Sequence, residues 1–109
     1  MESSNLPTVV DELITTAHRG HNGRAAQTLH GGSQQRLRQT VIALTAGTEL
    51  AEHEAPAEAT LQVLRGHVTL TAGVRTWQGT DGDLVTIPDE RHGLSAQQDS
   101  AVLLTVITG

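Results

Sequence analysis

The hydrophobic pattern changes once along the chain. Over about residues 5–19 the apolar residues recur every three or four positions, with Pro7 near the start and Gly20 just past the end, which predicts an amphipathic helix. From Arg38 onward, short stretches of alternating apolar and polar residues are separated by turn signals about every 8–12 residues. This second pattern predicts a barrel of short strands over about residues 27–108.

Two of the predicted strands are apolar on both faces. Within residues 41–44, and again within residues 101–107, apolar side chains occupy odd and even positions alike. A strand of this kind must be covered on both faces. A chain this small has one interior, so the second cover is either the N-terminal helix or another subunit. We predict a homodimer, because isologous two-fold pairing is the commonest way to cover such a surface.

The most informative spacing lies between Gly47 and Gly66. If this segment is extended, its odd positions share one face, which is apolar apart from a single histidine. The residues of that face are His53, Ala55, Ala59, Leu61 and Val63. Gly66 is then expected to make a tight reversal into residues 67–72, so that the two strands form a hairpin.

At these residues the chain resembles the cupin family. The first motif of that family is G-x5-H-x-H-x3/4-E-x6-G. Gly47, His53 and Gly66 stand at matching places, whereas Ala55 replaces the second histidine and Ala59 replaces the glutamate. The motif is therefore only partly present.

The second cupin motif, G-x5-P-x-G-x2-H-x3-N, follows later in the chain. Gly82 and Pro88 match it, Glu90 stands at its second glycine, and His92 comes one residue early. The resemblance implies an all-β fold, a jelly-roll barrel of two sheets, preceded here by the short N-terminal helix. The 109 residues are expected to form a single domain.

The resemblance also implies a metal site. In the family, the two histidines and the glutamate of the first motif and the histidine of the second hold a divalent metal inside the barrel. Of that set this chain keeps His53 and His92, which the resemblance places on facing strands of one barrel mouth. The candidate metals are Zn, Ni, Fe, Mn and Cu. Neutral imidazole is a good ligand for Zn, Ni, Cu and Fe, but catalytic zinc sites usually have three protein ligands. A divalent metal here is therefore expected to be weakly held.

We predict a small-molecule pocket in the same barrel, because a few polar groups on apolar walls are typical of such sites. Arg38 has the parity of Ile42 and Leu44, so it could reach the pocket and bind a carboxylate, or instead lie at a solvated strand end. The predicted lining is His53, Ala55, Ala59, Leu61, Val63, His92, Leu94 and Arg38.

The composition restricts the classes of partner that the protein is expected to bind. The net charge is -5 and the seven basic residues are scattered, which argues against nucleic acid as a partner. The chain has no cysteine, hence no thiol nucleophile, and no apolar run of the ~18 residues that would suggest a membrane span. Its first residues lack the features of a signal peptide, so the cytoplasm is expected. An aromatic ligand would have only Trp77 to stack against, since Phe and Tyr are absent.

Three functions remain open at this point. One is a cupin that binds a small molecule without catalysis, for which the alanines leave room. Another is a metal-dependent enzyme of the oxygenase, isomerase or decarboxylase type, which would need a third ligand from outside the motifs. The third is a structural or regulatory dimer with a vestigial pocket. General acid–base chemistry by His53 or His92 is conceivable, so the sequence leaves open whether the protein is an enzyme.

Overall fold

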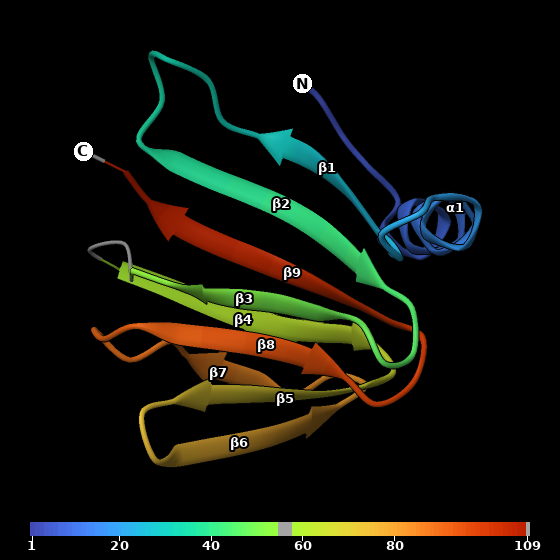
Figure 1. Ribbon diagram of the computed structural model, residues 1–109. Helices are drawn as coiled ribbons and strands as arrows, with labels where there is room; N and C mark the ends of the chain where they lie inside the picture. The colour runs from blue at the N-terminus through green and yellow to red at the C-terminus, as the bar shows by residue number, and fades with distance from the viewer. Residues whose placement is uncertain (55–57, 109) are drawn as a thin grey trace.

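The computed structural model describes residues 1–54 and 58–108, in which one helix is followed by nine strands (Figure 1). These elements are α1 (Leu6–Arg19), β1 (Arg24–His30), β2 (Leu37–Leu44), β3 (Glu49–His53), β4 (Glu58–Arg65), β5 (His67–Ala72), β6 (Arg75–Thr80), β7 (Leu84–Thr86), β8 (His92–Ala96) and β9 (Ser100–Ile107). Within the same residues, no helix is both long enough and apolar enough to cross a membrane.

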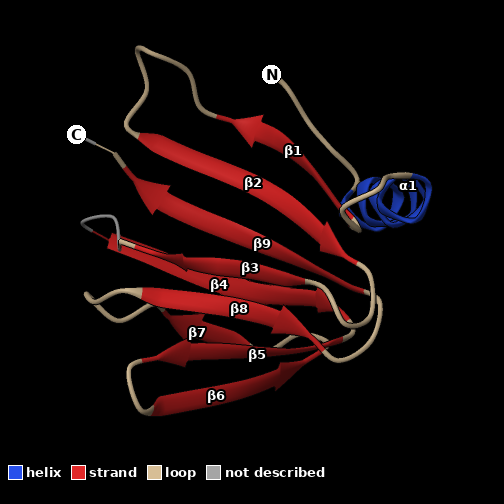
Figure 2. Ribbon diagram, in the orientation of Figure 1, coloured by secondary structure: helices blue, strands red, loops and turns tan. Residues whose placement is uncertain are grey.

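The strands form two sheets that face each other (Figure 2). One has the order β1-β2-β9-β4-β7 and the other the order β3-β8-β5-β6. Every pair of neighbouring strands is antiparallel. The predicted all-β fold, a jelly-roll barrel with a short N-terminal helix, is confirmed.

The core lies between the sheets and is built from alternate residues of each strand. From the five-stranded sheet it receives Leu44, Ala59, Leu61, Val63 and Val102, and from the four-stranded sheet Val68, Leu70, Leu94 and Ala96, with Ile87 beside them. Successive side chains of a strand point to opposite faces, so one alternating set fills this interior. The positions between them point to the outer faces of the two sheets.

The helix covers the outer face of the five-stranded sheet. The Asn5 side chain caps it by accepting a hydrogen bond from the Thr8 amide at 3.0 Å. Its buried residues Val9, Val10, Leu13 and Ala17 pack against Val41, Ala43 and Ala101. Burying a Val or Leu side chain contributes about 1.5–3 kcal/mol, so this face holds the helix firmly. Of the two covers that the sequence left open, the helix therefore provides one.

The predicted hairpin at Gly66 is wrong. The strand before it, β4, pairs with β7 and β9, whereas the strand after it, β5, pairs with β6 and β8. Gly66 has φ +104°, and a Cβ there would collide with the Ser100 side chain and the Asp99 carbonyl. The glycine is needed where the chain crosses from one sheet to the other.

Candidate functional site

His53 and His92 meet at one end of the barrel. His53 ends β3, His92 begins β8, and the two residues are cross-strand partners in the same sheet. Their ring centroids are 4.5 Å apart and the rings lie edge to face, with an interplanar angle of 63°. The resemblance implied facing strands, which is corrected here to neighbouring strands, because the β3–β8 ladder ends in this pair.

The two rings differ in exposure. His92 is buried, with 4% of its surface exposed, whereas His53 is exposed. The residue opposite His92 on its other side is Ala72 of β5, which is also buried. A molecule arriving from solvent would therefore reach His53 directly and His92 only from the barrel mouth.

Backbone contacts determine which nitrogen of each ring carries the proton. The Nδ1 atom of His53 lies 3.2 Å from the carbonyl oxygen of Ala51, and that of His92 lies 3.0 Å from the carbonyl oxygen of Glu90. A carbonyl only accepts, so each Nδ1–H must donate. In the neutral rings both Nε2 atoms then keep a lone pair. Metal-binding histidines commonly have this same carbonyl contact.

Charged groups surround the pair on the outside. Arg91 lies 3.5 Å from the Glu54 carboxylate and 3.9 Å from that of Glu52, and it donates to the Glu52 carbonyl oxygen at 3.2 Å. These contacts engage the carboxylates nearest to His53 away from its ring. Within residues 1–54 and 58–108, no group of three or more His, Asp or Glu side chains is placed to hold a metal ion. The geometry offers two imidazole donors.

The apolar residues predicted to line the pocket lie behind the histidines. Ala59, Leu61, Val63 and Leu94 are all buried in the interior core. Along the pairing of β4 with β9, Ala59 lies opposite Val106 near one end, whereas Val63 lies opposite Val102 near the other end. Leu61, Val63 and Leu94 thus belong to the packed interior, with Ala59 nearest the start of β4. Ala55 lies outside the described residues.

Arg38 is at the start of β2 and is exposed. Its ladder partner is Val106, which in turn pairs with Ala59 across β9, so these three residues form one row over the sheet. The Arg38 side chain packs against Gly31, where a Cβ would come within 3.0 Å of its Cγ atom. The structure thus places Arg38 on the interior parity but packed beside β1.

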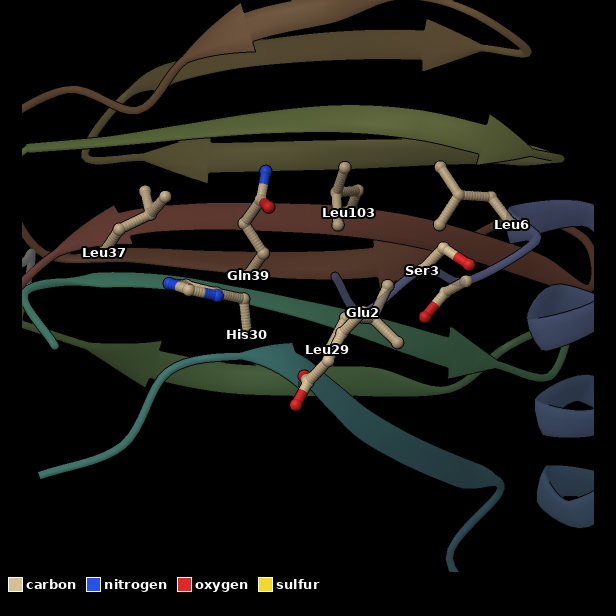
Figure 3. Close-up of a pocket in the computed structure, with 9 residues that line it drawn as sticks. Glu2, Ser3, Leu6, Leu29, His30, Leu37, Gln39 and Leu103 are labelled. Carbon is tan, nitrogen blue, oxygen red and sulfur yellow. The ribbon is translucent and has the colours of Figure 1, made fainter.

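Two cavities were missed from the sequence. One, of about 250 Å³, is lined by Leu70, Ala72, Arg75, Thr76, Trp77, Val85, Thr86 and Pro88. The other, of about 700 Å³, lies on the outer face of the five-stranded sheet, between the N-terminal segment and β1, β2 and β9 (Figure 3). Its lining includes Glu2, Leu6, Leu29, His30, Leu37, Gln39 and Leu103. The larger one is lined by neither His53 nor His92, so it is not the site that the motifs predict.

No family model and no curated protein matches the sequence. The structure, however, is similar to that of an RmlC-like cupin protein from Desulfovibrio desulfuricans, with 23% identity, a TM-score of 0.75 and coverage of 98% of this chain and 96% of that one. It is also similar to a conserved protein of unknown function from Streptococcus pyogenes, with 26% identity, a TM-score of 0.73 and coverage of 83% and 78%.

A third similar structure is an enzyme. It is a mutant of the salicylate 1,2-dioxygenase from Pseudoaminobacter salicylatoxidans in complex with gentisate, 20% identical, with a TM-score of 0.78 over 92% of this chain. This chain covers 32% of the dioxygenase. Together with the two facing sheets and the partial motifs, these similarities show that the chain is a small protein of the cupin fold.

Proposed function

We propose that the protein binds a small molecule at the mouth of its barrel, with His53 and His92 as the polar groups that contact it. The observation that carries this proposal is the arrangement of the two rings, 4.5 Å apart, each with its Nδ1 atom held by a backbone carbonyl. Each ring then keeps an Nε2 lone pair, and the pair of rings lies at the edge of an apolar interior. Few polar groups on apolar walls are typical of a small-molecule site.

The same two nitrogens would suit a divalent transition metal such as Zn, Ni, Fe, Mn or Cu. A bound metal would supply Lewis-acid chemistry at the mouth. His53 and His92 would be its protein ligands, fewer than the three that catalytic zinc sites usually have. Two donors give little preorganisation, so occupancy should be partial and easily reversed by a chelator.

A metal-dependent enzyme is the second candidate, and the dioxygenase of the same fold supports it. That candidate requires a third ligand. Ala59 stands where the family motif has glutamate, and the Glu52 and Glu54 side chains lie by Arg91. These features favour binding over catalysis.

The test combines a thermal-shift screen of small molecules with a titration of Ni²⁺. Compounds that raise the unfolding temperature of the wild type should lose that effect in His53→Ala and in His92→Ala, and Ni²⁺ binding should weaken in both. His21→Ala, which removes an exposed histidine outside the barrel strands, is the matched control and should behave as the wild type. Circular dichroism establishes that each variant folds. Compounds that stabilise both site variants as much as the wild type would place the binding site elsewhere.

A further inference from the structure

A recess opens where β6 and β7 separate. These strands follow each other in the chain, yet β6 is at the edge of one sheet and β7 at the edge of the other. They are joined through the turn in which the Asp83 amide donates to the Thr80 carbonyl, and from there they diverge. The cavity of about 250 Å³ lies between them, and we call it the Trp77 recess after the aromatic side chain in its lining.

The Trp77 ring is held in place by the sequence around it. Trp77 and Gly79 are two residues apart on β6, so they share one face of the strand. The ring lies over Gly79, where any Cβ would collide with three of its carbon atoms. Trp77 is half-buried and packs against the interior core. Because Gly79 has no side chain, the Trp77 ring packs directly against it and is held in one position beside the recess.

The lining combines apolar walls with a neutral polar rim. Beside the Trp77 ring, the walls are the apolar residues Leu70, Ala72, Val85 and Pro88. The exposed threonines Thr76 and Thr86 border the recess from the outward faces of β6 and β7, where they pair with Thr71 and Thr60. The one charged residue in the lining, Arg75, is paired with Glu90 at 3.0 Å, so the two charges cancel. An anion would approach Arg75 against the Glu90 carboxylate, which favours an uncharged ligand.

The volume limits the size of the occupant. An engineered protein cavity of about 150 Å³ binds benzene, and drug-sized ligands occupy pockets of about 300–1,000 Å³. A recess of about 250 Å³ lies between these sizes. It has room for one six-membered ring with a short substituent.

We infer that the Trp77 recess binds a neutral single-ring molecule, with the ring against Trp77 and between the apolar side chains of Leu70, Ala72 and Val85. The inference goes beyond the proposed function, because no histidine is among the described residues that line the recess. Ala72 is the cross-strand partner of both Arg75 and His92, so the recess lies on the same inner face of the sheet as His92, one strand further along.

Trp77 itself provides the measurement. It is the one Trp in a chain without Tyr or Phe, so tryptophan emission reports on this recess alone. Titration with benzyl alcohol should change that emission saturably, with a dissociation constant of about 1 mM, since small ligands bind with a limited free energy per atom. Benzoate should bind about tenfold more weakly, because its carboxylate loses water beside Glu90.

Val85→Phe fills the recess and should weaken benzyl alcohol binding at least about tenfold. Val74→Phe is the matched control, because Val74 is fully exposed in the β5–β6 turn, and it should bind as the wild type does. If circular dichroism shows that Val85→Phe is not folded, Val85→Leu at the same inward position replaces it, with a smaller loss expected.

Four results would overturn the inference. Three of them are a wild-type emission that does not saturate, equal affinity in a folded filling variant and the wild type, and benzoate binding as tightly as benzyl alcohol. His53→Ala separates the two sites, since benzyl alcohol binding should survive it. Loss of binding in His53→Ala would place the ring at the histidines, which overturns the recess and leaves the proposed function standing.

Discussion

At the scale of single residues, the two histidines are held in the same way by their own backbone. Each Nδ1 atom contacts the carbonyl oxygen two residues earlier, Ala51 for His53 and Glu90 for His92. Such a contact depends on the local chain and not on a distant partner. It fixes the tautomer of both rings in the same way, so that each neutral ring keeps a lone pair on Nε2.

Restoring the missing acid of the family motif is the residue-scale prediction. Ala59 is 8% exposed and belongs to the interior core. In Ala59→Glu, a buried carboxylate without metal should lower the unfolding temperature. Added Zn²⁺ should reverse that loss, because binding to the folded state alone stabilises it. The Zn²⁺ affinity should rise at least about tenfold, which corresponds to roughly 1.4 kcal/mol.

The control for this variant is the double substitution Ala59→Glu with His53→Ala, in which the gain in Zn²⁺ affinity should disappear. Isothermal titration calorimetry measures both proteins. Equal Zn²⁺ affinity in Ala59→Glu and the wild type would mean that position 59 does not point toward the histidines. The partner substitution of the motif, Ala55→His, concerns a residue outside the described part of the chain.

At the scale of the elements, the sequence predicts faces better than neighbours. Alternation identifies the inward residues of β4 and β5, because each strand buries one face against the same interior. Alternation does not say to which of the two sheets a strand belongs. The sequence therefore predicts a hairpin at Gly66, where the chain in fact crosses from one sheet to the other. The spacing of the motifs likewise identifies His53 and His92 as a pair. It does not show that they lie on neighbouring strands of one sheet.

The Trp77 recess could not be predicted from the sequence either, because alternation does not show which sheet a strand joins. It exists because β6 and β7 diverge into different sheets, and its walls come from β5, β6, β7 and Pro88. A single aromatic residue has no periodicity. The sequence does place Trp77 and Gly79 on one face of β6, which indicates that the ring packs over the glycine. It does not indicate a cavity beside the ring.

One aspartate links the helix to two turns of the barrel. Asp99 accepts a hydrogen bond from the Ala46 amide at 2.9 Å and lies 2.6 Å from Nε2 of His18 in the last turn of α1. The hydrogen bond from Ala46, followed by the contact with His18, lowers the pKa of the Asp99 carboxyl. The ionised Asp99 carboxylate is thus the form that holds His18, and with it the end of α1, against the barrel.

The stability that Asp99 provides should depend on pH. A lowered pKa in the folded state means that this contribution is complete above about pH 4 and is lost as the pH falls through the lowered value. Asp99→Asn should therefore reduce the free energy of unfolding at neutral pH, by less than about 1 kcal/mol because both side chains of the pair are partly exposed. Urea denaturation at about pH 7 and about pH 3 should show the difference from the wild type shrinking at the lower pH. An equal loss at both values would contradict the role of the charge, and Asp89→Asn, at an exposed position, is the control.

At the scale of the whole molecule, the outer face of the five-stranded sheet is only partly covered. The helix packs on Val41, Ala43 and Ala101, at one end of β2 and β9. Toward the other end, Leu37 is 38% exposed and Leu103 lines the cavity of about 700 Å³ (Figure 3). An exposed apolar face of this kind is typical of an interaction surface.

We expect two copies of the chain to meet on this face. A stable interface buries about 800 Å² on each partner, and the chain exposes 6549 Å² in all, so the face need supply only a modest share of the surface. Sedimentation velocity at micromolar concentration should show a dimer for the wild type. Leu103→Arg should shift it to a monomer, because an unpaired charge in the interface costs several kcal/mol. Val74→Arg, which puts the same charge on the distant β5–β6 turn, should remain a dimer, and a monomeric wild type would mean that the helix and the N-terminal segment suffice as the cover.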